Sequence, residues 1–511
     1  KSDKMAAEHG AMRKLFASGA TRPMEWRIKQ LKALIRMVEV DSKPLYEAMM
    51  NDLGKPESET YLSEIAIVRS EAEAFLSKLS AHMAPEAVPS PGVAMPCFSY
   101  VRKEPRGVVL IMGPFNYPAN LLLGPLAAAL ACGNCAVLKP SEYTPTVAEW
   151  VKATIPKHFP PDVVAVQMGG VAEATALLRL SWDLIFFTGS ERVGRIVSQA
   201  AAKTLSPVVL ELGGKSPVVI DKSPPNVRAM CNRLAWGKTL NCGQTCVAPD
   251  YILCHESQVE PVSAGLVSSW RQMFGDDPKA SKFFSRIVSV QHAKRLVELI
   301  EEAEAAGCVP LCGGSKACNA SERFIAPTLF VDPPFHLRIL KEEIFGPVVS
   351  LIRFKTETEA ISTIQGMPGT PLALYVFTTD QAVCDRILDA CPSGGSMRND
   401  VILHFANNHV PFGGLGTSGH GNAHGKYGLR TFSHERAFVD KPCHPAFEFA
   451  NIRYAPYDKY GGYSGKVFAF LLEVVQGLGP RIVHAFKFVL PTAVVFGRQS
   501  RQSQTNCVCV C

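Results

Sequence analysis

The stretch Gly107-Val-Val-Leu-Ile-Met-Gly-Pro114 decides the fold of this chain. Its five apolar residues, three of them β-branched, run into a Gly-Pro pair, a pattern typical of a buried strand that ends in a turn. Similar short apolar runs follow at 136–138, 163–168 and 184–187, with helical stretches between them. Because strands that alternate with helices pair in parallel, the sequence predicts an α/β fold with a doubly wound sheet.

A second α/β stretch begins near residue 208. The strands and helices expected in it are strands at 208–210, 218–220, 251–253 and 348–352, and helices at 227–239, 259–273 and 289–306. Ahead of the first strand, residues 24–50 and 61–83 have apolar positions at helical spacing and predict amphipathic helices. The α/β pattern ends at about residue 441.

Composition restricts the class of protein. Of 511 residues, 47% are apolar and 19% charged, which is typical of a folded globular chain. The net charge is +7, and residues 441–511 carry eight Lys or Arg against three Asp or Glu, so they supply +5 of it. The remaining +2 argues against nucleic-acid binding by the body of the protein. The basic tail suits an anionic membrane surface.

Cysteine use and the N-terminus indicate the compartment. Sixteen scattered cysteines, about 3% of the chain, are too few for a disulfide scaffold, so we expect a reducing, intracellular environment. Residues 1–16 contain no apolar signal core. The chain does not begin with Met, which leaves its natural N-terminus open.

Three Gly-marked segments carry groups that could do chemistry. They are Gly113-Pro-Phe-Asn-Tyr-Pro118, Leu210-Glu-Leu-Gly-Gly-Lys-Ser-Pro217 and Asn241-Cys-Gly-Gln-Thr-Cys-Val-Ala-Pro249. A thiol (Cys246), an amide donor (Asn116) and a carboxylate (Glu211) suffice for acyl-thioester chemistry. The thiolate attacks a carbonyl, the amide stabilises the oxyanion, and the carboxylate activates water. The alternative is that Cys246 is a packed core thiol.

Other motifs carry less weight. Residues 414–419 satisfy Gly-x-Gly-x-x-Gly, but more Gly and His follow instead of a long helix, so the dinucleotide fingerprint lacks its context. The pair Cys132 and Cys135 spans a helix end and a buried strand, which favours packing over redox or zinc chemistry. Three further thiols, Cys308, Cys312 and Cys318, have no matching His cluster, and we expect no metal site.

Several motifs occur in a fixed order along the chain. They are Phe115-Asn-Tyr-Pro118, Leu138-Lys-Pro-Ser-Glu142, Phe187-Thr-Gly-Ser-Glu-Arg-Val-Gly194, Leu210-Glu-Leu-Gly-Gly-Lys215, Gly243-Gln-Thr-Cys246, Glu342-Glu-Ile-Phe-Gly-Pro347 and Pro411-Phe-Gly-Gly414. In this order they resemble an aldehyde dehydrogenase. The segments 236–254, Asn399-Asp400, His424-Gly-Lys and 431–434 narrow the resemblance to the class 3 branch. The match runs from about residue 11 to 440.

The resemblance implies a catalytic set. Cys246 matches the nucleophile, Asn116 the side-chain oxyanion donor and Glu211 the general base of deacylation. The backbone N–H of Cys246 is the second oxyanion donor. Many relatives have Ser at the position of Cys242, so this thiol is either inert or forms a reversible disulfide with Cys246.

The resemblance also implies a binding site for NAD, with NADP as the alternative. The matching residues are Lys139 and Glu142 at the adenosine ribose, Gly189, Ser190 and Gly194 in the dinucleotide loop, and Glu343 and Phe345 near the nicotinamide ribose. A carboxylate at Glu142 accepts a hydrogen bond from a free ribose 2′-hydroxyl and repels a 2′-phosphate. The alternative is that Glu142 is an acid placed near a helix N-terminus.

The family architecture is α/β: a Rossmann-type nucleotide-binding domain, an α/β catalytic domain and a small bridging β element. The expected boundaries are 1–80 with 106–212 for NAD(P) binding, 213–403 for catalysis, 81–105 with 404–440 for bridging and oligomerisation, and 441–511 for the tail. The resemblance implies a homodimer whose bridging strands cross between subunits.

The predicted function is NAD(P)-dependent oxidation of a medium- or long-chain aliphatic aldehyde to its acid, through a cysteine thiohemiacetal and thioester. Three alternatives stay open at this point. They are a soluble dehydrogenase of aromatic or short-chain aldehydes, a cofactor-free thiol hydrolase, and a non-catalytic structural protein.

The tail resembles that of long-chain fatty aldehyde dehydrogenases. Its apolar runs at 467–475 and 482–496 are separated by Gly and Pro, and the longer run would reach about 22 Å as a helix, short of a ~30 Å hydrocarbon core. A hairpin or interfacial helix is therefore favoured over a single span, and packing on the body or on a partner subunit is the alternative. Terminal thiols at Cys507, Cys509 and Cys511 suggest S-acylation. We expect attachment to the cytoplasmic side of a membrane, with the endoplasmic reticulum as one candidate.

Overall fold

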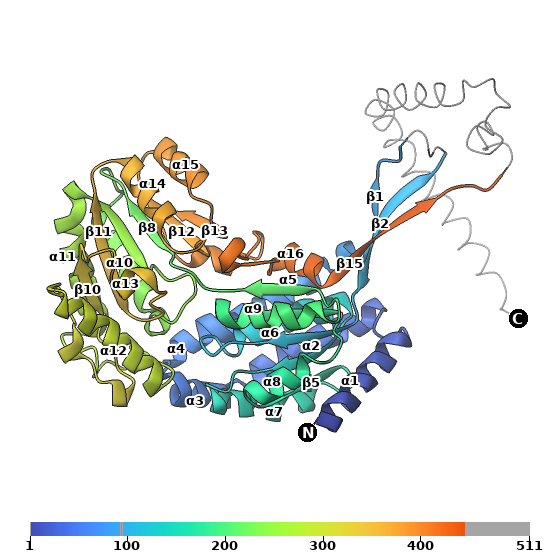
Figure 1. Cartoon of the computed structure of the whole chain (residues 1–511). Helices are drawn as coiled ribbons and strands as arrows, with labels where there is room; N and C mark the ends of the chain where they lie inside the picture. Colours follow the sequence, from blue (N-terminus) through green and yellow to red (C-terminus); the bar gives the residue numbers. More distant parts are fainter. Residues whose placement is uncertain (1, 92–93, 95, 445–511) are drawn as a thin grey trace, which may run out of the picture. The chain divides into compact units, whose positions relative to one another are not determined.

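The computed structural model describes residues 2–91, 94 and 96–444 (Figure 1). The chain forms two compact units, which are described separately. The first contains Lys1–His82 and Pro105–His434, and the second contains Met83–Glu104 and Glu435–Cys511. The predicted apolar runs and terminal thiols of the tail lie outside the described residues.

The first sheet of unit 1 contains the stretch that decides the fold. Its order is β14-β7-β6-β3-β4-β5. The strands are β3 (Val108–Met112), β4 (Cys135–Lys139), β5 (Val164–Val166), β6 (Leu184–Thr188), β7 (Val208–Glu211) and β14 (Gly419–His420). From β7 to β5 the neighbours pair in parallel, whereas β14 runs antiparallel to β7. Each strand predicted in this region is confirmed.

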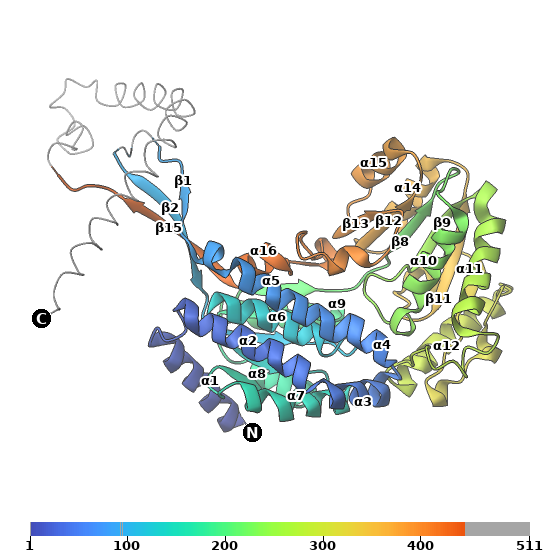
Figure 2. The same cartoon turned by 180° about the vertical axis from the view of Figure 1, so that it is seen from behind.

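Helices cover both faces of this sheet. Val108 and Leu110 of β3 pack in one core cluster with Met12 of α1 (Ser2–Ala17) and Val197 of α9 (Glu191–Ala202). Since side chains alternate along a strand, the residues between them face α6 (Asn120–Cys132) on the other side. In Figure 1, helix α9 is on the side nearer the viewer. Figure 2 shows the sheet from behind, where α2 (Met24–Val40) is nearer the viewer and packs on α6.

The second sheet of unit 1 has the order β10-β11-β9-β8-β12-β13 and is parallel throughout the described residues. Its strands are β8 (Pro217–Ile220), β9 (Tyr251–His255), β10 (Thr328–Val331), β11 (Val348–Phe354), β12 (Ala373–Phe377) and β13 (Gly395–Arg398). The helices around it are α10 (Val227–Thr239), α11 (Val259–Phe274), α12 (Val290–Ala305), α13 (Arg338–Lys341), α14 (Glu357–Gly366) and α15 (Gln381–Ala390). Strands β10, β12 and β13 were not predicted from the sequence. The predicted α/β class with parallel sheets is confirmed.

The remaining helices correct two expectations. The segment 24–50 is two helices, α2 and α3 (Ser42–Leu53), because the chain leaves the helical path at Asp41. The segment 61–83 begins as a π-helix, η1 (Tyr61–Ile65), before α5 (Ala66–Met83). The others are α4 (Glu57–Thr60), α7 (Pro145–His158), α8 (Val171–Leu177) and α16 (Gly425–Thr431).

Unit 2 contains a three-stranded sheet in the order β1-β2-β15. The strands are β1 (Glu86–Val88), β2 (Phe98–Pro105) and β15 (Ser433–Asp440). Residues 404–434, predicted as part of the bridging element, are grouped with unit 1 and include β14 and α16. No helix within the described residues combines the length and the apolar character needed to cross a membrane.

Candidate active site

A cavity of about 540 Å³ opens at the carboxyl ends of the first sheet's strands. Its wall contains residues at or just after the ends of β3 (113–116), β4 (139 and 141–143), β6 (188–190) and β7 (211–213). This edge is where open α/β sheets bind ligands. The opposite wall comes from the chain around the second sheet.

The cavity gathers the residues predicted from sequence. Those in its wall are Asn116, Lys139, Glu142, Gly189, Ser190, Glu211, Cys246, Glu343 and Phe345. Gly194 does not line the cavity. A Cβ atom at Gly194 would lie 2.8 Å from Leu212 Cδ2, so this glycine lets α9 pack against the chain after β7.

The loop that carries the thiol has an unusual backbone. Asn241, Cys242 and Gly243 have φ values of +51°, +55° and +74°, three consecutive left-handed residues of which two are not glycine. Such a conformation costs energy and persists only where surrounding contacts impose it. We call residues 241–246 the nucleophile loop, after the role predicted for Cys246. The left-handed turn reverses the chain after α10 and brings Cys246 to the cavity wall.

Cys246 is partly buried and free. The pKa of its thiol is raised to about 12, mainly by burial and also by the negative charges of Glu343 and Glu211, with a smaller opposing effect from backbone N–H groups of the same turn. The thiol is therefore protonated at neutral pH unless a positive charge or a base comes close to it.

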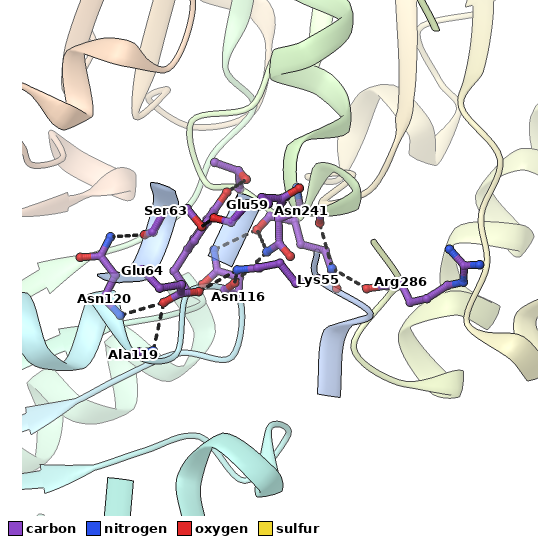
Figure 3. Close-up of polar contacts among 12 residues, drawn as sticks. Lys55, Glu59, Ser63, Glu64, Asn116, Ala119, Asn120, Asn241 and Arg286 are labelled. Carbon is purple, nitrogen blue, oxygen red and sulfur yellow. Dashed lines mark hydrogen bonds and ion pairs between the residues drawn. The ribbon is translucent and has the colours of Figure 1, made fainter. Parts of the chain in front are cut away.

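Asn116 lies against the nucleophile loop. Its Nδ2 donates a hydrogen bond to the carbonyl oxygen of Gln244 at 3.0 Å. The carbonyl oxygen of Asn116 accepts from Asn241 Nδ2 at 2.7 Å and from Lys55 Nζ at 3.1 Å (Figure 3). The Asn116 side chain is therefore bonded to the loop that carries the thiol.

Glu211 ends β7 and is 4% exposed. Burial raises the pKa of its carboxyl to about 7; His424 opposes this shift and Glu71 adds to it. Its Oε1 atom has no hydrogen-bond partner among the residues that the structure describes. Glu211 also lines a second, smaller cavity together with Glu71, Asn120 and His424. In that cavity His424 Nδ1 lies 3.2 Å from both carboxylate oxygens of Glu71.

The Gly-rich segment 414–419 has a structural place beside Glu211. It forms a short 3-10 helix, Gly416–Ser418, and then strand β14, as expected for a motif outside the dinucleotide context. Gly419 pairs with Glu211, and a Cβ at Gly419 would lie 1.9 Å from the carbonyl oxygen of Leu210. Only glycine permits this approach.

The dinucleotide side of the cavity fits a phosphate-bearing cofactor. Ser190 caps α9, its Oγ accepting from the N–H of Val193 at 3.5 Å, so the open helix end faces the cavity. A Cβ at Gly189 would lie 2.6 Å from Phe187 Cζ, which leaves the backbone there bare. Lys139 Nζ forms an ion pair with Glu142 at 3.0 Å.

Glu343 and Phe345 lie across the cavity. Glu343 accepts a hydrogen bond from the N–H of Gly214 at 3.2 Å. Burial raises the pKa of Glu343 to about 7, and Asp250 adds to the shift. Phe345 has a left-handed φ of +53°, a strained conformation of the kind found at functional sites.

Sequence analysis missed an aromatic group in the cavity wall. Phe115 contacts the rings of Tyr143, His292 and Phe345, with centroids 5.9, 5.3 and 5.7 Å away. Phe115 belongs to the motif Phe115-Asn-Tyr-Pro118, but no role was predicted for its side chain. His292 lies on α12, where no local pattern distinguishes it from a surface residue.

The other cysteines are consistent with packing. Cys132 and Cys135 are free and buried, at the end of α6 and the start of β4. Cys242 is a free, fully buried thiol whose pKa burial raises above its usual range, which favours the inert alternative. Within the described residues, no group of three or more His, Cys, Asp or Glu side chains is arranged to hold a metal ion.

Comparison with known proteins identifies this arrangement. The model of the aldehyde dehydrogenase family matches residues 2–438. The chain belongs to the aldehyde dehydrogenase family. Aldehyde dehydrogenase family 3 member A2 of Rattus norvegicus is 41% identical over 432 residues, which are 84% of this chain and 86% of the relative.

Solved aldehyde dehydrogenases have the same fold. The structure described as the substrate-bound state of Staphylococcus aureus AldH has a TM-score of 0.86 and 37% identity, and the match covers 91% of this chain and 99% of that one. The NAD+ complex of an aldehyde dehydrogenase from Bacillus cereus has a TM-score of 0.76 and 27% identity over 86% of this chain and 89% of that one. The protein is thus an NAD(P)-dependent aldehyde dehydrogenase that oxidises aldehydes to acids. The two alternatives of a cofactor-free thiol hydrolase and a non-catalytic structural protein are therefore excluded.

Proposed function

We propose that Cys246, Asn116 and Glu211 carry the oxidation, and that the natural substrate is a medium- or long-chain aliphatic aldehyde. The observation that carries the proposal is that these three residues, from three separate segments of the chain, line one cavity that also has a helix N-terminus in its wall. Thiol, amide donor and carboxyl are the groups that thioester chemistry needs.

Acylation requires the Cys246 thiol to lose its proton, which passes to solvent. The thiolate then adds to the aldehyde carbonyl and forms a thiohemiacetal. The oxyanion accepts hydrogen bonds from Asn116 Nδ2 and from the backbone N–H of Cys246. An amide nitrogen has two donors, and one of those on Asn116 already bonds Gln244, which aims the second. The bound NAD(P)+ supplies the hydride acceptor, which leaves a thioester on Cys246.

Deacylation is the task of Glu211. Its carboxylate takes a proton from water, and the hydroxide attacks the thioester carbonyl. The C–S bond then breaks, the acid leaves, and the proton held by Glu211 passes to the departing sulfur, so that the Cys246 thiol re-forms. A pKa of about 7 gives Glu211 a large carboxylate fraction at neutral pH and makes it a stronger base than an ordinary glutamate.

The cofactor is assigned to the side of the cavity formed by β4 and β6. Lys139 and Glu142 would hold the adenosine ribose, and Gly189 and Ser190 would face the phosphates at the N-terminus of α9. Gly194 supports this loop through its close packing on Leu212. Glu343 and Phe345 would hold the nicotinamide ribose from the opposite wall. Glu142 favours NAD, while Lys139 leaves NADP usable.

The larger assembly is a homodimer joined through the sheet of β1, β2 and β15. Residues 441–511 attach it to the cytoplasmic side of a membrane, by their +5 charge and apolar runs. A lipid surface is where long-chain aldehydes dissolve, which links the tail to the substrate class.

The test is a comparison of kcat/KM for saturated aldehydes of increasing chain length, with NAD and with NADP, in the wild type and in Cys246→Ala. The proposal expects kcat/KM to rise with chain length and all turnover to vanish in the variant. A preference for aromatic or short aldehydes would overturn the substrate class. Turnover by Cys246→Ala would overturn the catalytic assignment.

A further inference from the structure

Lys55 is a fully buried lysine in unit 1 that lies outside the cavity wall. Its Nζ donates to Glu64 Oε1 at 2.7 Å and to the carbonyl oxygen of Asn116 at 3.1 Å. The same nitrogen lies 4.3 Å from the centroid of the Tyr117 ring. Burying an ammonium group is costly unless it is paired, so this position needs a reason.

Glu64, the partner of Lys55, is also fully buried. Its second oxygen accepts the backbone N–H groups of Ala119 at 3.1 Å and Asn120 at 2.8 Å, where α6 begins. Glu64 belongs to the π-helix η1, an irregular turn of the kind found at functional sites. Lys55 and Glu64 together hold both ends of the segment 116–120.

Glu59 makes the equivalent contact with the other loop. Its Oε1 accepts the backbone N–H of Asn241 at 2.8 Å. Asn241 is the first of the three left-handed residues, and its side chain donates to the carbonyl oxygen of Asn116 (Figure 3). Residues 55–64 therefore form hydrogen bonds both to the segment 116–120 and to the nucleophile loop.

We propose that Lys55, Glu59 and Glu64 are positioning residues that hold Asn116 and the nucleophile loop in register for oxyanion stabilisation. The inference rests on the proposed role of Asn116. The carbonyl oxygen of Asn116 accepts from Lys55 and from Asn241, which fixes its peptide plane from two directions and hence the direction of its side chain. A misplacement of about 1 Å at a reacting group costs about 10²-fold in rate.

The alternative is that the three charges only stabilise the fold. Buried ion pairs are often neutral for stability relative to apolar replacements, so their presence does not favour that alternative. The two roles differ in one measurable way. A positioning residue acts through Asn116, whereas a merely stabilising residue acts independently of it.

The experiment is a cycle of variants in the full-length enzyme. Lys55→Met is combined with Glu64→Gln, so that no carboxylate is left buried without its partner and the acceptor for the N–H groups of α6 is kept. The pair is measured alone and together with Asn116→Ala. The readouts are the pre-steady-state rate of NADH formation, the Kd for NADH and the Tm.

The Lys55→Met/Glu64→Gln enzyme should form NADH about 10²-fold more slowly, with the Kd for NADH changed less than about twofold. Added to Asn116→Ala, the pair should cost no more than about threefold further, since interacting sites are not additive. A further loss of about 10²-fold on top of Asn116→Ala would show independent action and overturn the proposal. So would an unchanged rate of NADH formation.

Glu59 supplies a second test if the paired variant does not fold. Glu59→Gln keeps an acceptor for the N–H of Asn241 and should stay within about threefold of the wild-type rate, whereas Glu59→Leu should lose about tenfold or more. Equal rates for the two variants would overturn the role of Glu59.

Met12→Ala, in the buried core of α1, is the stability control: its Tm should fall while NADH formation at 25 °C stays unchanged.

A failure of the underlying function is separable from a failure of this inference. If Asn116→Ala itself formed NADH at the wild-type rate, the proposed function would be wrong at that residue. If Asn116→Ala is slow but the Lys55 and Glu59 variants are not, only the positioning role is wrong.

Discussion

Asn116 and Gln244 are joined across the active site, with Nδ2 of Asn116 donating to the carbonyl oxygen of Gln244 at 3.0 Å. Gln244 precedes Cys246 by two residues, and its side chain is itself held by the carbonyl oxygens of Asn241 and Arg286, each at 3.0 Å. The amide donor thus gains its direction from the same loop that carries the thiol. A substitution in either loop should therefore alter the position of the other loop.

Asn116→Ala should lower kcat by roughly 10²–10³, the usual cost of one oxyanion donor. Asn116→Asp keeps the shape but removes the N–H groups, so it should lose at least as much. Stopped-flow NADH formation measures the acylation step directly. An acylation rate close to wild type in both variants would remove Asn116 from the oxyanion role.

Cys246→Ala should abolish dehydrogenase turnover and leave cofactor binding intact, because the thiol is the only group of the site able to form the thiohemiacetal. NADH fluorescence titration gives the binding, and an absorbance assay with an aliphatic aldehyde gives the turnover. Cys384→Ala, a buried thiol of α15 away from the cavity, is the matched control and should keep its activity. Turnover by Cys246→Ala well above background would contradict the mechanism.

Glu211→Gln should slow deacylation and spare acylation. We expect a burst of about one NADH per site and then slow turnover, because a neutral amide cannot take the proton from water. In the wild type, the carboxylate form of Glu211 increases as pH rises through about 7, so the single-turnover rate of deacylation should rise over that range and level off above it. A deacylation rate independent of pH between 6 and 8 would point to another base.

The predicted strands had a local signal, but not every strand with such a signal was predicted, since β12 (Ala373–Phe377) is an apolar run buried at every position. Strand β3 is buried on both faces and reads as an unbroken apolar run. Strand β13, with the sequence Gly-Ser-Met-Arg, is an edge strand with exposed positions and has no such run. The break at Asp41 did leave a signal, since Pro44 lies in the first turn of α3, where proline marks a helix start.

The predicted parts of the site were those carried by motifs. Cys246 and Asn116 follow Gly-marked turns, Glu211 precedes one, and all three were predicted from these surroundings. Lys55 and Glu64 were not, because a single lysine and a single glutamate resemble surface charges until the fold brings Lys55 to a carbonyl 61 positions away. Contacts of that separation are set by tertiary packing and leave no local pattern.

Glu142→Gln should shift cofactor selectivity toward NADP. The substitution removes a carboxylate that repels a 2′-phosphate and releases Lys139 from its 3.0 Å ion pair. The ratio of kcat/KM for NADP to that for NAD should rise, by about tenfold if the lost repulsion is worth about 1.4 kcal/mol. Glu149→Gln, on the exposed side of α7, is the control for a change of net charge. An unmoved ratio would mean that Glu142 does not face the ribose.

Deletion of residues 464–511 should release the enzyme from membranes while activity on short, soluble aldehydes persists. Each basic residue near an anionic leaflet adds about 1 kcal/mol of attraction, and two apolar runs add burial in the interface. Fractionation at physiological salt, with the full chain beside the deletion variant, gives the partition. Activity on long-chain aldehydes in vesicles should fall more than activity on short ones, because the anchor brings the cavity to the phase in which those substrates dissolve.

Alanine replacement of Cys507, Cys509 and Cys511 separates acylation from the apolar runs, and it should weaken membrane binding only if lipid chains contribute. Full-length protein found in the high-speed supernatant would contradict the anchor and favour a tail packed on the enzyme.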